Sequence, residues 1–196
     1  MMVDFSHIAL QDRDEPVILP WPASGNAGAF LSFDHPAEWR TFIEGLGIDP
    51  HIPQIIQARF ARAQTLYLLG WIDFSLIKAG ELAALVALEL AVMDRYGGKV
   101  SKGKRNFANL LKQMVEVDGL TDADIPMVTR CNGTAIGQLT GSTHPTLAER
   151  RNMLAHGDPF DGFPTGGLLE LVRDLIDYAY RDFIAEAAAN GVQEQR

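Results

Sequence analysis

Three residues in the last quarter of the chain have side chains that suit proton transfer and anion binding: Arg151, Asn152 and His156. An imidazole with an unperturbed pKa near 6.5 accepts or donates a proton near neutral pH. A guanidinium offers a rigid fork of N–H donors to the oxygens of a phosphate or a carboxylate. These three residues are therefore the first candidates for a functional site.

A helix is expected to position these side chains, because apolar residues recur around them at three- and four-residue steps. A helix turns by about 100° per residue, so Arg151 falls on the apolar face, while Asn152 and His156 fall on another face. An unpaired charge on an apolar face is costly, and Arg151 therefore needs an anionic partner. The glycine after His156 is typical of a helix end, which places the imidazole there.

The expected carboxylate partner lies on an upstream helix that is apolar from Leu82 to Met93 except for Glu89. We expect Arg151 to pair with Glu89, with Glu81 as the other candidate for that pair. The alternative is that Glu89 lies in a gap and meets solvent. If Arg151 forms this pair and has no other role, it serves only to join two helices.

The order Arg151-Asn152, three further residues and His156, in an Ala-His-Gly ending, resembles the Arg-x4-His signature of the HEPN superfamily. The resemblance covers roughly residues 50 to 190. It implies a helical bundle and a metal-independent endoribonuclease without a cofactor, in which the ribose 2′-hydroxyl attacks phosphorus to leave a 2′,3′-cyclic phosphate. Asn152 would orient the imidazole or touch the ribose. Arg150 fits a looser family spacing, so either arginine is a candidate for the phosphate contact.

The same resemblance implies a homodimer whose motif helices face each other across the two-fold axis, since one histidine rarely serves as both acid and base. Phe160 and Phe163 are candidate dimer contacts. Family context suggests a toxin–antitoxin or defence setting, with an antitoxin or a nucleotidyltransferase as partner. Members of the superfamily can also lack nuclease activity. The alternative function is therefore a catalytically silent helical module that binds a protein or nucleic-acid partner.

The net charge of −8 argues at first against RNA, because phosphate binding depends on Lys and Arg. Residues 1 to 50 hold eight carboxylates against two arginines, a net charge of −6, which leaves −2 for the rest of the chain. One local basic cluster lies in residues 97–106, where it is either a solvated turn or an RNA-backbone contact; it consists of Lys99, Lys102, Lys104 and Arg105. The acidic arm is a candidate internal inhibitor of a basic cleft.

The amino-acid composition bears on disulfides, metal sites and membrane spans. The single cysteine, Cys131, excludes an internal disulfide, and no Cys/His cluster has zinc spacing, so no metal site is expected. The longest apolar run is too short to cross a bilayer and no apolar leader opens the chain. The prediction is a soluble cytoplasmic protein without a membrane partner.

The predicted fold class is all-α: an up-and-down bundle of four to five main helices with an irregular arm rich in Pro and Gly. The predicted divisions are an arm packed on the bundle (1–48), the HEPN-like bundle (49–190) and a frayed tail (191–196). The arm carries at most one short strand and a helix at about 36–45. Bundle helices are expected at about 50–74, 76–96 and 107–115, a small element from Thr121, a loop at 132–141, the motif helix from 143–145 to His156, and a last helix capped by Thr165.

Overall fold

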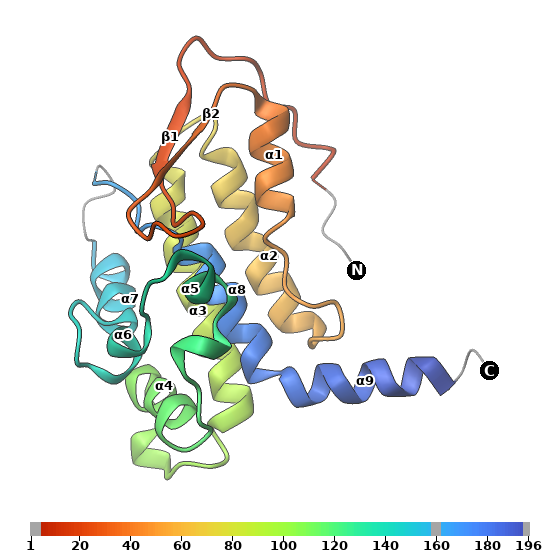
Figure 1. The fold of residues 1–196 in the computed structure, drawn as a ribbon, viewed down its shortest axis with the longest axis vertical. Helices are drawn as coiled ribbons and strands as arrows, with labels where there is room; N and C mark the ends of the chain where they lie inside the picture. Colours follow the sequence, from red (N-terminus) through yellow and green to blue (C-terminus); the bar gives the residue numbers. More distant parts are fainter. Residues whose placement is uncertain (1–4, 158–161, 194–196) are drawn as a thin grey trace.

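A computed structural model of the chain describes residues 5–157 and 162–193, with side chains up to residue 189. The described chain is mostly helical and folds around one core (Figure 1). The mostly helical prediction is confirmed, with one addition: a small two-stranded antiparallel sheet lies in the N-terminal arm. No described helix is both long enough and apolar enough to span a membrane.

The arm contains a β-hairpin followed by a helix. Strand β1 (Val17–Pro20) pairs with β2 (Phe30–Phe33), and the register sets Val17 opposite Phe33. Two strands form where at most one was predicted, because Val17 and Leu19 alternate inward onto the core. Helix α1 (Pro36–Glu44) follows. Trp21, Phe33 and Trp39 of the arm are buried in the core, whereas Phe30 is exposed.

The two longest helices are α2 (Gln54–Leu69) and α3 (Leu76–Tyr96), which pack against each other along their length. The predicted apolar face of α2 is buried, but the helix is shorter at both ends than predicted. It begins only after Pro53, and the chain turns at residues 70–75, where the Asp73 carboxylate accepts hydrogen bonds from the backbone and hydroxyl of Ser75. Close packing also depends on Gly80, because a Cβ there would lie 2.6 Å from the Tyr67 ring.

Helix α3 is the centre of the fold and packs against α2, against α4 (Phe107–Glu116) and against two later helices, α7 (Leu147–Ala155) and α8 (Leu168–Ala179). After it come a 3-10 turn η1 (Lys102–Lys104), α4 (Phe107–Glu116), a second 3-10 turn η2 (Asp122–Asp124) and α5 (Pro126–Cys131). The capping box predicted at Thr121 and Asp124 is present. The predicted loop at 132–141 is wrong in part, because residues Ile136–Thr140 form a short helix, α6, whose first N–H groups donate to Asp122.

The motif helix is α7 (Leu147–Ala155). It begins later than predicted, because a capping box at Thr146 and Glu149 satisfies its first N–H groups. It ends where predicted: His156 is the C-cap residue, and Gly157 has a φ of +94°, in the left-handed region that glycine favours.

The predicted last helix is two helices, α8 (Leu168–Ala179) and α9 (Arg181–Gln193). The break follows from two arginines: Arg95 donates to the carbonyl of Ala179, and Arg181 donates to the carbonyl of Tyr178, which a continuous helix would use itself. Helix α9 projects from the body (Figure 1) and continues to Gln193, past the predicted start of fraying. Thr165 does not cap α8, whose N-cap residue is Gly167.

Candidate functional site

Arg151 and Glu89 form the ion pair that the sequence predicted. The Arg151 Nε and Nη2 atoms lie 2.9 and 2.8 Å from Glu89 Oε2, joining α7 to α3. The pair is not in a dry place: the side chains of Arg151 and Glu89 are 31% and 27% exposed. Arg151 Nη1 donates to Asn152 Oδ1 at 3.3 Å, so all three guanidinium nitrogens have a partner, and one N–H of Nη1 and one of Nη2 are left for a ligand.

Asn152 and His156 are both exposed, one helical turn apart on the outward face of α7. The backbone N–H of His156 donates to the carbonyl of Asn152 at 3.0 Å, which closes the last turn of the helix. No hydrogen bond joins the imidazole to another described residue. The ring is therefore exposed and accessible to a ligand.

Arg150 and Glu81 have roles that differ from the predicted ones. Arg150 turns inward: its Nη1 donates to Thr165 Oγ1 at 3.1 Å, and its Nε is buried without a partner among the described residues. Glu81 is also buried and pairs with Lys78 at 3.4 Å, not with Arg151. Of the two arginines, Arg151 is the one whose guanidinium reaches the exposed face.

The basic cluster lies apart from the motif helix. Lys99, Lys102, Lys104 and Arg105 are all exposed, and Lys99 Nζ lies 5.2 Å from the centre of the Tyr96 ring. Figure 1 places this loop at the far end of α3 from the N-terminal hairpin, with α7 between them in height. The described arm therefore does not cover the cluster, and this arrangement argues against the arm as its inhibitor.

The opposite end of α7 carries a second histidine. His144 Nδ1 lies 2.8 Å from Glu149 Oε2, and the same carboxylate accepts the N–H of Thr146 in the capping box. These hydrogen bonds lower the pKa of Glu149. His144 thus supports the start of the helix and lies away from His156.

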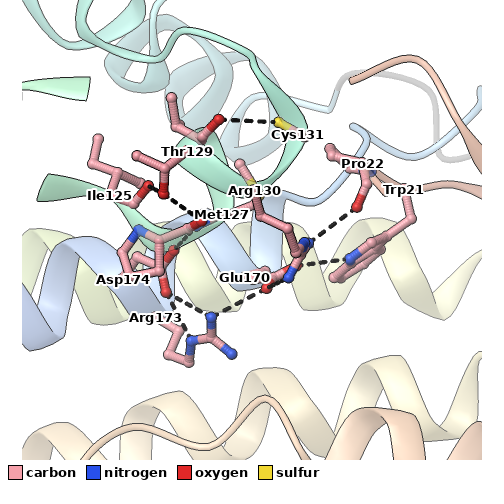
Figure 2. A network of polar contacts seen from close by, with 12 residues as sticks. Trp21, Pro22, Ile125, Met127, Thr129, Arg130, Cys131, Glu170, Arg173 and Asp174 are labelled. Carbon is pink, nitrogen blue, oxygen red and sulfur yellow. Dashed lines mark hydrogen bonds and ion pairs between the residues drawn. The ribbon is translucent and has the colours of Figure 1, made fainter. Parts of the chain in front are cut away.

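A buried polar network was not found by sequence reasoning (Figure 2). Glu170 on α8, whose side chain is 4% exposed, accepts a two-point contact from Arg130 on α5, with nitrogen to oxygen distances of 2.6 and 2.8 Å. It also accepts the indole N–H of Trp21 at 2.9 Å, and Arg130 donates to the carbonyl of Pro22. This network attaches the arm to two helices far along the chain.

The network continues along α8. Arg173 bridges Glu170 and Asp174, and Asp174 accepts the backbone N–H of Met127 at the start of α5. Burial alone would raise the pKa of Glu170, but the hydrogen bonds from Arg130 and Trp21 lower it. For Asp174 burial prevails and the pKa is raised. Every carboxylate here has partners, which is typical of a structural network rather than a reactive site.

A sequence signal for this network did exist. Glu170, Asp174 and Asp177 recur at steps of four and three residues, so they line one face of a helix whose other residues are mostly apolar. Two arginines, Arg130 and Arg173, supply the opposite charge. What the sequence did not show was which arginine would meet that face.

The motif residues lie on an open surface and line neither of two hollows next to α8. One hollow, of about 420 Å³, lies between α8 and the segment around Gly119, Asp124 and Pro126. The other, of about 450 Å³, lies between α8, α1 and the hairpin. Within residues 5–157 and 162–193, no group of three or more His, Cys, Asp or Glu side chains is arranged to hold a metal ion.

Comparisons of the chain with protein-family models, with curated proteins and with solved structures found no match.

Proposed function

We propose that the protein is a metal-independent endoribonuclease of the HEPN type, with Arg151, Asn152 and His156 of α7 as its catalytic residues. The observation that carries the proposal is their common placement. Asn152 and His156 are exposed on α7, and the Glu89 carboxylate holds the adjacent, partly exposed Arg151. An exposed imidazole and a guanidinium held by a carboxylate, both on one short helix, are groups that suit phosphate ester chemistry.

In this proposal the ribose 2′-hydroxyl attacks the neighbouring phosphorus. A base accepts the hydroxyl proton as the new P–O bond forms, and the P–O5′ bond breaks as the leaving oxygen gains a proton. The products are a 2′,3′-cyclic phosphate and a free 5′-hydroxyl. His156 carries one of the two proton transfers, and the N–H groups of Arg151 that Glu89 and Asn152 leave unoccupied stabilise the charge that builds on the phosphate oxygens.

The second proton transfer calls for a second group, and the proposal takes it from a second copy of the chain. Helix α7 presents a surface rather than a pocket, so a facing α7 would complete a cleft. Two large apolar side chains near the motif are exposed and suit such an interface: Met153 at 46% and Phe163 at 73%. Phe160, the other predicted dimer contact, lies outside the described residues.

The finer description of the fold belongs to the same proposal. Helices α2, α3, α4, α7 and α8 would be the four to five main helices of a HEPN-like bundle within residues 49–190. The basic cluster around η1 would contact the RNA backbone beyond the cleavage site. An antitoxin or a nucleotidyltransferase partner in the cytoplasm remains part of this proposal through the resemblance alone.

The test is to incubate the purified protein with a labelled structured RNA in EDTA and to identify the product ends. We expect cleavage that leaves 2′,3′-cyclic phosphate. A matched substrate with one 2′-deoxyribose at the cleaved position should resist cleavage there, because the attacking hydroxyl is missing. Cleavage of that substrate at the same position, or cleavage that EDTA abolishes, would contradict the mechanism.

A second candidate function is a silent helical module that binds a partner. The observation that favours it is the occupation of Arg151 Nε and Nη2 by Glu89, which leaves only part of the guanidinium for phosphate. This function would be favoured over the first if a folded dimer cleaved no tested RNA but bound RNA through the basic cluster.

A further inference from the structure

Helix α7 has little apolar surface with which to hold its position. Of its nine residues only Leu147 and Leu154 are buried. A helix of this length is not stable alone in water. The placement of Arg151 and His156 therefore depends on the polar contacts that fasten α7 to the rest of the molecule.

Thr165 is the residue at which these contacts meet. Its backbone N–H donates to the Glu81 carboxylate of α3, and its hydroxyl accepts from Arg150 Nη1 of α7 at 3.1 Å. One residue, which comes after the motif helix in the chain, thus connects α7 to α3. This contact lies on the inner side of α7, away from the exposed Asn152 and His156.

Glu81 is a firm anchor for this connection. It is 1% exposed, and the Lys78 ammonium lies 3.4 Å away, one turn earlier in α3. Burial raises the pKa of Glu81, while the Thr165 N–H and Lys78 oppose that shift. A buried carboxylate with two fixed partners cannot leave them without a large desolvation cost.

We propose that Glu81 is a positioning residue of the ribonuclease site, which acts through Thr165 and Arg150 to hold α7; this inference rests on the proposed function. Successive helical residues point about 100° apart. With Arg150 held inward, Arg151 is directed to Glu89 and to the surface. Glu81 and Glu89 lie eight residues apart on α3, about 12 Å along its axis. Attachment at two such points prevents α7 from rolling about its own axis.

The test compares two pairs of variants by RNA cleavage and by NMR. Thr165→Val removes the hydroxyl that Arg150 needs, whereas Thr165→Ser keeps it. Glu81→Ala removes the acceptor of the Thr165 N–H, whereas Glu81→Gln keeps an oxygen there. We expect kcat to fall about tenfold in Thr165→Val and Glu81→Ala with KM changed less than about twofold. The Ser and Gln variants should retain most of the wild-type kcat.

The NMR signals of Arg151 Nε–Hε and of the His156 ring give a readout that does not need activity. Both signals should shift in Thr165→Val and stay at their wild-type positions in Thr165→Ser. This comparison can be made even if Glu81→Ala does not fold. An active wild type with unchanged kcat and unchanged signals in Thr165→Val would overturn the inference and leave the proposed function intact. If the wild type cleaves no RNA, the proposed function fails, and the catalytic part of this inference fails with it; the NMR signals then decide whether Thr165 and Arg150 hold α7.

Discussion

Two arginine–carboxylate sites in this protein have opposite characters. Around Glu170 the carboxylates are buried, although Arg130 itself is 42% exposed, and each carboxylate has several partners; Figure 2 shows these contacts. Around Arg151 one pair is partly exposed, and the neighbouring Asn152 and His156 face solvent. The first arrangement fixes the arm and α5 on α8. The second leaves donors and a titratable ring available to a ligand, which is where function is expected.

The comparison predicts the largest change in stability at Glu170. Glu170→Ala would leave the buried indole N–H of Trp21 and the guanidinium of Arg130 without their acceptor and should lower the free energy of unfolding by about 2 to 3 kcal/mol. Urea denaturation measures this. Glu116→Ala, at an exposed position on α4, is the control and should change stability by less than about 0.5 kcal/mol. Equal effects of the two variants would mean that the network does not hold the arm.

Arg151→Ala should show the reverse pattern. The Arg151–Glu89 pair is partly exposed, so its loss should cost less than about 1 kcal/mol of stability. Cleavage should fall by about 100-fold, because an oriented donor to the developing charge is lost. Single-turnover kinetics and urea denaturation on the same samples check both statements. A large loss of stability with unchanged cleavage would mean that Arg151 has a structural role and no catalytic one.

The buried side of the comparison also predicts that stability depends on pH, through Asp177, which lies one turn beyond Asp174 on α8. Burial raises its pKa to about 6, although it accepts the Asp49 N–H and lies near Arg173. The folded state therefore binds more protons than the unfolded state between about pH 4 and 6, and stability falls as pH rises through that window. Asp177→Asn keeps an oxygen for Asp49 and should be about 2 kcal/mol more stable than wild type at pH 7.5. A difference that stays constant from pH 4 to 7.5 would contradict this account.

The smallest effect is expected in the exposed basic cluster. Replacing Lys102 and Lys104 by alanine should weaken RNA binding only a few-fold. It should also lower the slope of the log binding constant against log salt concentration by about one per lysine. Arg59→Ala, at an exposed position on α2, is the matched control and should leave the salt slope unchanged. Fluorescence anisotropy at several salt concentrations measures both. An unchanged salt slope in the double variant would mean that the cluster does not contact RNA and is only a solvated turn.

The sequence predicted the parts of the fold that local patterns determine. The inward face of α2, the stop of α3 at its glycines, the capping box at Thr121 and the helix end at Gly157 all follow from spacing and residue type. The break after α8 could not be predicted, because it depends on Arg95, more than eighty positions earlier, taking a helical carbonyl.

The same distinction applies to the candidate site. The Arg151–Glu89 pair was predictable because Glu89 is the single charge in the apolar run from Leu82 to Met93, and Arg151 falls on the apolar face of its own helix. The inward turn of Arg150 was not, because its acceptor Thr165 is held by Glu81 of a third segment. The Glu170 network escaped prediction for a similar reason, since Arg130 and Trp21 come to α8 from distant parts of the chain.

The most direct test of the central claim compares the histidines at the two ends of α7. His156→Ala and His144→Ala should be assayed for RNA cleavage in EDTA, with unfolding measured on the same preparations. We expect His156→Ala to lose at least about 100-fold in cleavage with little change in stability, because no hydrogen bond or ion pair joins the exposed ring to the other described residues. His144→Ala should cleave RNA as the wild type does. Equal cleavage by the two variants would contradict the assignment of His156 to the chemistry.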